Sequence, residues 1–200
     1  MSRTAVPTRP TDTPADSLGP TRAAATPRPG RWVIDPHRSD LRVGVKVGGL
    51  VPVQGRFAEL AGTVELTADP ERTQISARVA TASLTSGSSH WDAVLTHAGL
   101  VDVRTNPQIA FTSTALRAGS ATGWAARRWE LDGTLLTGRG TLAVRFALCC
   151  TEASTERITL RATGSVGSRD AVRLLSQPGF EKLIGRSMAV DLAIEAAPAA

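Results

Sequence analysis

Three residues near the middle of the chain, His90, Asp92 and His97, are of types that bind transition metals. If they lie on a helix, His90 and His97 are about two turns apart and Asp92 lies off the line that joins them. The chain has one further histidine, His37. Because a zinc site needs at least three protein ligands that converge on one point, the sequence predicts solvated polar residues here and no metal site.

Nucleophilic catalysis has two kinds of candidate, the abundant hydroxyl side chains and the adjacent pair Cys149 and Cys150. The sequence contains no Gly-x-Ser-x-Gly turn, the motif that exposes a serine nucleophile in many hydrolases. The cysteine pair ends an apolar alternating run, where neighbouring side chains point to opposite faces. The sequence therefore predicts one small buried thiol, one surface thiol and no catalytic residues, so that the protein is not an enzyme.

The elements that must position these residues are mostly β-strands. From Arg31 onward, apolar residues alternate with polar ones in run after run, which is typical of a strand with one buried face. These runs cover residues 41–47, 64–66, 75–79, 109–111, 131–135, 142–148, 158–162 and 188–196. Together with shorter segments they predict eight or nine strands.

Turns and brief helices separate the predicted strands. Asp69-Pro70 is a turn signal, and residues 137–140 (Thr-Gly-Arg-Gly) are typical of a hairpin between two alternating runs. Short helices are expected over residues 90–97 and 169–175. Closing an antiparallel sheet on itself removes exposed edges. The predicted fold is thus all-β, an antiparallel β-barrel of about eight strands with one or two short helices.

The first 30 residues differ in composition from the rest. They hold six of the 12 prolines and six threonines, with too little apolar surface to offset the entropy of ordering. We expect a disordered tail over 1–30 and one domain over 31–197. No secretory signal is recognised in the tail, and no run reaches the 18–20 uncharged apolar residues of a membrane helix. A cytoplasmic protein is therefore expected.

The positive charge of the chain is spread along it. There are 23 basic and 18 acidic residues, a net charge of +5, and most arginines stand singly among apolar residues, as Arg42, Arg78, Arg145 and Arg161 do. Such positions are typical of the solvent face of strands. Aromatic residues make up only 4% of the chain, too few for base stacking. No nucleic-acid partner is expected.

The inward positions of the predicted barrel carry medium-sized and small aliphatic side chains, with Phe57, Phe111 and Phe146 as the strand phenylalanines. A filled core and an apolar cavity both fit this pattern. A ligand in such a cavity would be apolar and elongated, since each buried methylene contributes about 0.8 kcal/mol. The expected contacts are Leu41, Val43, Val45, Phe57, Val79, Leu95, Ile109, Phe111, Val144, Phe146 and Leu192. Trp32 is predicted to plug one end, and Trp124 and Trp129 to rim the other.

Polar residues near the predicted helices are candidates for contact with a ligand's polar head. They are Asp92, Arg169 and Asp170. Each also has a local structural interpretation, since Arg169 and Asp170 are typical of an ion pair at a helix start. Asp35 before Pro36 is likewise typical of a turn into a strand. Both interpretations stay open for each residue.

The order and spacing of short motifs resemble the YceI-like family of lipocalin-like barrels, which bind polyisoprenoids or similar amphiphiles. The resemblance begins at residues 32–36 (Trp-Val-Ile-Asp-Pro) and extends to about residue 197. Further matching segments are Ser39, 41–47, 55–57, Gly62, 82–84, Asp92, Ala93, Leu95, 102–103, 107–109, 111–114, 133–135, 169–170 and 184–185. The resemblance implies a non-catalytic protein without a cofactor that sequesters or carries a polyisoprenoid, quinone or fatty chain.

The chain departs from the family mainly at polar positions. Arg38 and Val47 stand where the family usually has histidines. Trp91 and Val94 replace the Arg and the His of its Arg-Asp-x-His-Leu run. These losses make transfer of the fold safer than transfer of the ligand. The alternative is a packed structural or stress-response module that acts through a protein partner. The sequence indicates no particular oligomeric state.

Overall fold

The computed structural model describes residues 26–47, 49–90, 92–93, 101–118, 128–176 and 185–199. Eleven strands and a helix are defined among them. These are β1 (Gly30–Ile34), β2 (Asp40–Val47), β3 (Val51–Phe57), β4 (Leu60–Leu66), β5 (Gln74–Ala80), β6 (Leu84–Thr85), β7 (Gln108–Ala118), β8 (Arg128–Thr137), β9 (Gly140–Ala153), β10 (Ile158–Gly167), β11 (Ser187–Pro198) and α2 (Ser168–Leu175). Single 3₁₀ turns occupy Pro70–Arg72 and Thr81–Ser83.

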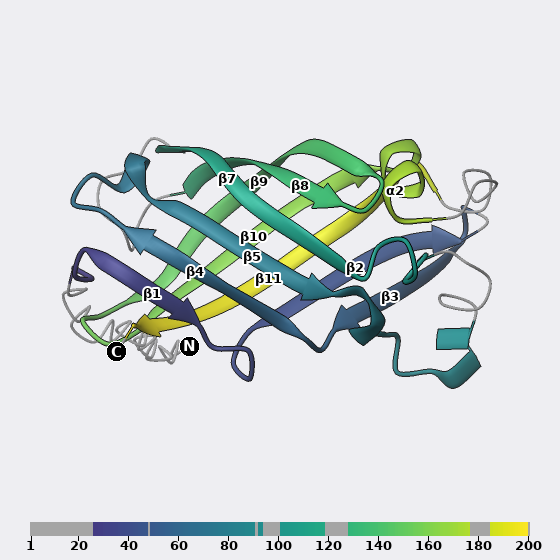
Figure 1. Cartoon of the computed structure of the whole chain (residues 1–200), viewed down its shortest axis with the longest axis horizontal. Coiled ribbons are helices and arrows are strands. Elements are labelled where there is room, and N and C mark those ends of the chain that lie inside the picture. The colour runs from purple at the N-terminus through teal and green to yellow at the C-terminus, as the bar shows by residue number, and fades with distance from the viewer. Residues whose placement is uncertain are drawn as a thin grey trace, which may run out of the picture.

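Eight of the strands form a closed antiparallel ring in the order β1-β4-β5-β7-β8-β9-β10-β11, and β11 pairs back with β1 (Figure 1). The C-terminal part of β11 pairs with β1, and its middle part pairs with β2. The hairpin of β2 and β3 therefore extends the barrel wall beyond β1 and β4. The predicted all-β, lipocalin-like antiparallel barrel is confirmed.

The predicted turns and helices agree with the structure where it describes them. Residues 137–140 join β8 to β9 with Thr137 paired to Gly140, and Asp69 caps the turn at Pro70 by accepting a hydrogen bond from the Glu71 N–H. The helix predicted over 169–175 is α2. The helix predicted over 90–97 lies largely outside the described residues. No described helix combines the length and the apolar character needed to cross a bilayer.

The barrel has two different ends. The helix end carries α2, the β2–β3 turn at residues 47–51 and the β8–β9 turn (Figure 1). At the opposite end, called the tryptophan end, β1, β8 and β10 begin, with Trp32, Trp129 and Ile158 near their first residues. Trp129 was expected opposite Trp32, and that expectation is wrong. Three strands, β4, β5 and β7, lie between β1 and β8 in the ring, and each neighbour is antiparallel to the next. The strands β1 and β8 therefore run in the same direction and begin at the same end of the barrel. Trp124 lies outside the described residues.

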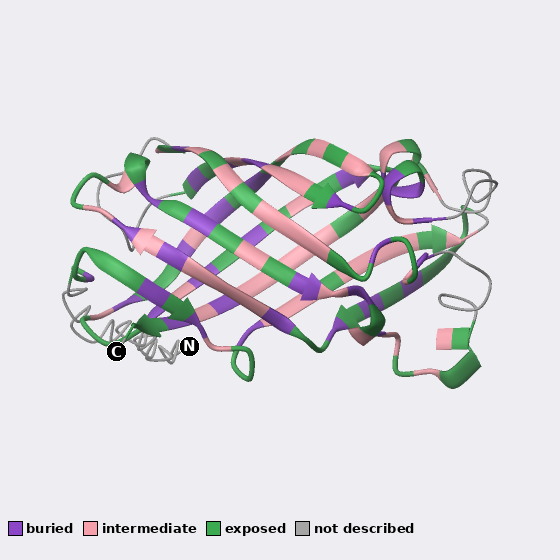
Figure 2. Cartoon of the chain, viewed as in Figure 1, coloured by how far each residue is buried: buried purple, intermediate pink, exposed green. Residues whose placement is uncertain are grey.

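Apolar side chains fill the tryptophan end completely. Trp32, Val64, Trp129, Ile158 and Leu160 are each exposed by 2% or less. Buried and exposed residues alternate along the strands, as the period-two pattern predicts (Figure 2). The core of this half is therefore a packed plug.

Outward arginines bind carboxylates on neighbouring strands. Asp132 of β8 lies between Arg117 of β7 and Arg145 of β9, and Arg161 of β10 contacts Asp191 of β11 at 2.6 Å. The hydrogen bonds from Arg145 and Arg117 lower the pKa of Asp132. Arg42, Arg78, Arg145 and Arg161 are all exposed. The interpretation of scattered arginines as a solvent face is confirmed.

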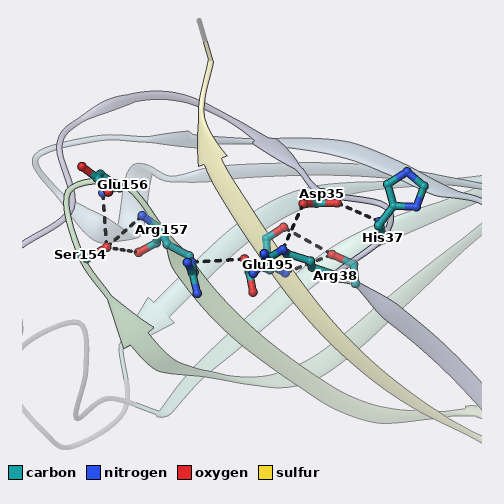
Figure 3. A network of polar contacts seen from close by, with 8 residues as sticks. Asp35, His37, Arg38, Ser154, Glu156, Arg157 and Glu195 are labelled. Atoms are coloured by element: carbon teal, nitrogen blue, oxygen red, sulfur yellow. Dashed lines mark hydrogen bonds and ion pairs between the residues drawn. The ribbon is translucent and has the colours of Figure 1, made fainter.

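A polar network holds the bend between β1 and β2 against β11 (Figure 3). The Asp35 carboxylate accepts a hydrogen bond from the His37 N–H at 2.8 Å, which confirms the turn interpretation of Asp35. Glu195 of β11 contacts Arg38 at 3.1 Å and Arg157 at 3.2 Å. These contacts stabilise the point where β11 changes its partner from β2 to β1.

Candidate functional site

An apolar cavity of about 150 Å³ lies within the barrel between its centre and the helix end. Its wall is formed by every long strand except β1 and by α2. Eight of the predicted ligand contacts line it, namely Leu41, Val43, Phe57, Val79, Ile109, Phe111, Phe146 and Leu192. The tryptophan plug does not contribute to the wall, so the cavity ends where the packed half begins.

The remaining predicted contacts have other positions. Val45 lines a second cavity of about 60 Å³. Val144 packs against the core without lining either cavity, and Leu95 lies outside the described residues. Sequence reasoning missed the wall residues Leu131 and Met188, which belong to the predicted alternating runs, and Leu60, which lies just before the run at 64–66. It also missed Ala171, Leu174 and Leu175 of α2, because helical periodicity gives a packing face but not its partner.

The second cavity adjoins the first. Both are lined by Val43, Leu84, Val101, Ala171, Leu175 and Met188. The second cavity adds Val45 and Val53, which come from the two strands of the β2–β3 hairpin. The apolar space therefore extends from the barrel centre towards the hairpin and α2 at the helix end.

Two glycines leave room for the phenylalanine rings on the cavity wall. A Cβ atom on Gly133 would lie 2.2 Å from the Phe111 ring, and one on Gly164 would lie 2.6 Å from the Phe146 ring. The two rings meet edge to face, with centroids 5.9 Å apart. Each ring therefore lies over a glycine of a neighbouring strand, in space that the Cβ atom of any other residue would occupy.

The cavity wall offers few polar atoms. Among the described residues, Arg78 and Thr137 are those with polar side chains on the main wall. Arg78 is exposed in an outward position of β5. The Thr137 hydroxyl lies 3.3 Å from the carbonyl oxygen of Gly140 and 3.4 Å from that of Leu174. Its hydrogen-bonding capacity is already used by the protein. The wall is thus suited to hydrocarbon.

The three residues predicted to contact a polar head do not line either cavity. Asp92 accepts hydrogen bonds from the Ser86 hydroxyl at 2.6 Å and the Thr85 hydroxyl at 2.8 Å, and these bonds lower its pKa. Arg169 is exposed on the first turn of α2, and Asp170 contacts Arg173 at 3.4 Å. Contact with a ligand head stays a prediction for all three.

A buried acidic turn, which sequence reasoning did not single out, closes the cavity next to α2. The Asp102 N–H donates to the Leu175 carbonyl at 2.7 Å, while neighbouring Val101 lines both cavities. The Asp102 carboxylate accepts hydrogen bonds from the Thr105 hydroxyl at 2.7 Å and from Arg139 at 2.5 Å. These two partners lower its pKa to about 2.

Ionised Asp102 should make stability depend on acid. Because its pKa falls from 3.8 in the unfolded chain to about 2 in the fold, its stabilising contribution is complete above about pH 4 and is lost as the pH falls towards 2. Asp102→Asn lacks this contribution. Urea unfolding from about pH 6 to 2.5 should show a stability difference between wild type and variant that shrinks on acidification. A difference that stays constant with pH would contradict the assignment.

Neither the cysteines nor the described histidine and acidic side chains converge on a reactive or metal-binding site. Cys150 is buried and Cys149 half-buried, and both thiols are free. Burial raises the pKa of Cys150 to about 11. Within the described ranges, no three histidine, cysteine or acidic side chains gather as a metal site requires. His97 lies outside those ranges.

Comparison with known proteins places residues 32–196 in a sequence family. A family model described as the YceI-like domain matches these residues. No curated protein matches the chain.

The structure is similar to several solved structures at low sequence identity. BcnA from Burkholderia cenocepacia superposes with a TM-score of 0.67 and 16% identity, covering 81% of this chain and 98% of that one. A polyisoprenoid binding domain from Saccharophagus degradans gives 0.61 and 15%, covering 84% and 98%. A YCEI protein from Campylobacter jejuni gives 0.59 and 12%, covering 73% and 85%. At these identities the likeness concerns the fold.

Proposed function

The chain belongs to the YceI-like domain family, and from that premise we propose that its barrel binds the hydrocarbon chain of a single amphiphile, such as a polyisoprenoid, a quinone or a fatty acid. The protein sequesters or carries this molecule without changing it chemically. The observation that carries the proposal is the apolar cavity of about 150 Å³. The polyisoprenoid binding domain from Saccharophagus degradans, with the same fold, supports the ligand class.

The size of the cavity indicates how a chain would enter. A cavity of this volume accommodates a six-carbon ring. A longer chain therefore continues through the second cavity, past Val45 and Val53, and leaves the barrel at the helix end. About ten buried methylenes would contribute about 8 kcal/mol before the cost of ordering the ligand. Before the ordering cost is subtracted, a binding free energy of about 8 kcal/mol corresponds to a Kd of about 1 μM.

The cavity wall also supports carriage over catalysis. A catalyst of acid–base chemistry needs a titratable group within reach of its substrate. On the described wall the one ionisable side chain is that of Arg78, in an outward position. A packed structural module is expected to have an interior filled by its own side chains. The cavity lined by Phe111 and by Leu174 of α2 therefore favours ligand binding over that alternative.

The proposal is tested by mass spectrometry of the full chain under non-denaturing conditions. The purified protein is measured directly, after extraction with organic solvent, and after incubation with geranylgeraniol or palmitate. We expect one bound molecule per chain, removed by extraction and restored by a probe.

An extracted protein that stays folded by circular dichroism and takes up neither probe would overturn the proposal. An unextracted protein that carries a hydrophilic molecule of defined mass would do the same. Uptake of one probe and not the other supports the proposal and identifies the ligand class.

A further inference from the structure

The exposed large apolar side chains gather at the helix end. In the described part of the chain they are Val33, Leu50, Val51 and Leu136, and all but Val33 lie at that end. Leu50 is 86% exposed at the tip of the β2–β3 hairpin, next to Gly49 in the left-handed region with φ +77°. The turn thus projects an apolar knob, formed by the side chains of Leu50 and Val51, into solvent. A single exposed leucine needs no explanation, so its surroundings decide its meaning.

Basic side chains without an ion pair lie at the same end of the barrel as Leu50. Lys46, Arg104, Arg169 and Arg186 have no ion pair among the residues that the structure describes. The Gly185 N–H donates to the Lys46 carbonyl, and the Ser168 N–H donates to the Arg186 carbonyl, so the hairpin and the start of α2 lie together. The acids of the 101–106 turn and of α2, Asp102 and Asp170, are each already paired with an arginine.

The opposite end of the barrel has a different charge balance. Arg28 and Arg128 make no ion pair there within the described ranges, and neither do the acidic residues Glu71, Glu152 and Glu156. Among the residues that the structure describes, positive charge without an ion pair is therefore offset by acids at the tryptophan end and in excess at the helix end. The excess coincides with the apolar knob and with the end towards which both cavities extend.

We propose that the helix end docks on the surface of an anionic lipid bilayer. Leu50 and Val51 insert at the boundary between headgroups and acyl chains, where apolar side chains are stabilised. Lys46, Arg104, Arg169 and Arg186 lie against the lipid phosphates, each worth about 1 kcal/mol near an anionic surface, or about fivefold in affinity. Docking in this orientation presents the mouth of the proposed ligand site to the membrane, but it does not require that a ligand be bound.

The proposal is tested by flotation of the full chain with lipid vesicles. The vesicles contain phosphatidylcholine alone, or phosphatidylcholine with about one-third phosphatidylglycerol. We expect binding to the anionic vesicles only, and release at about 0.5 M salt, where the screening length is only a few ångströms. Leu50→Ser should weaken binding at least tenfold, because burying a leucine contributes about 1.5–3 kcal/mol. The double variant Lys46→Glu/Arg186→Glu should weaken it at least 25-fold.

Matched variants at the tryptophan end serve as controls. Val33→Ser removes an exposed apolar side chain there, and Arg28→Glu/Arg128→Glu produces the same net charge as the helix-end double variant. Both controls should bind as the wild type does. Equal weakening by the two double variants, binding to neutral vesicles, or no binding to anionic vesicles would overturn the proposal. The last result would direct the search to a protein partner for this end.

The outcomes separate docking from ligand binding. Vesicle binding that fails while uptake of geranylgeraniol or palmitate persists overturns docking alone. Uptake that fails while vesicle binding persists overturns the proposed function alone.

Discussion

Replacing Ala162 with phenylalanine should abolish ligand uptake while leaving the protein folded. Ala162 is 3% exposed on β10 and lines the main cavity. A phenyl ring there occupies the space that a ligand chain would use, since a cavity of about 150 Å³ holds about one benzene. Excluding about four methylenes removes about 3 kcal/mol, so affinity for geranylgeraniol or palmitate should fall at least 100-fold.

The stability of the same variant distinguishes a filled cavity from a disrupted core. Burial of the ring is favourable by about 1.5–3 kcal/mol, and overpacking strain opposes it by about 1–3 kcal/mol. The free energy of unfolding should therefore change by less than about 2 kcal/mol. Ala147→Phe, on the exposed face of neighbouring β9, is the matched control and should keep full uptake. Wild-type uptake by folded Ala162→Phe would mean that ligands bind elsewhere.

Trp32→Ala should cause the largest loss of stability among the substitutions considered. The Trp32 side chain is 1% exposed in the packed plug, and its indole N–H donates to the Arg28 carbonyl at 3.0 Å. Truncating a buried tryptophan costs about 3–5 kcal/mol, because transfer free energy is lost and a cavity remains. For a domain of this size the Tm should fall by roughly 6–20 °C, measured by calorimetry.

Ligand uptake provides a second measurement for Trp32→Ala. The plug separates the cavity from the tryptophan end, so uptake of geranylgeraniol at a temperature where the variant is folded should persist. Val33→Ala, on the outward face of the same strand, should lower the free energy of unfolding by less than about 0.5 kcal/mol. A similar loss from both variants would show that the plug is not a distinct stabilising unit.

The strand pattern could be interpreted from the sequence because its signal is local. Alternation at residues 41–47 and 188–196 reflects which side chain faces inward, and this depends only on the pleat. The same pleat places Leu41, Val43, Phe111 and Leu192 on the cavity wall. The hairpin at Gly138 and the helix at Ser168–Leu175 likewise follow from short-range preferences.

Other features depend on pairing between segments far apart in the chain. The position of Trp129 at the same end of the barrel as Trp32 follows from the direction of β8 in the ring, which no local pattern contains. The role of Asp102 follows from contacts with Arg139 and Leu175, 37 and 73 positions away (139 − 102 and 175 − 102). The charge excess at the helix end is equally non-local, since it depends on which described arginines, such as Arg117, Arg145 and Arg161, find a carboxylate on a neighbouring strand.

The sequence by itself determined that this protein is an all-β barrel with an apolar interior and a charged exterior, because apolar and polar residues alternate along each strand. Only the tertiary structure decided that the interior is packed towards the tryptophan end and contains a cavity towards the helix end. That outcome depends on volumes summed over many strands, because Phe111 and Phe146 lie over Gly133 and Gly164, while Trp32 and Trp129 are both buried towards the other end. The total volume of the inward side chains cannot be read from any single segment of the chain.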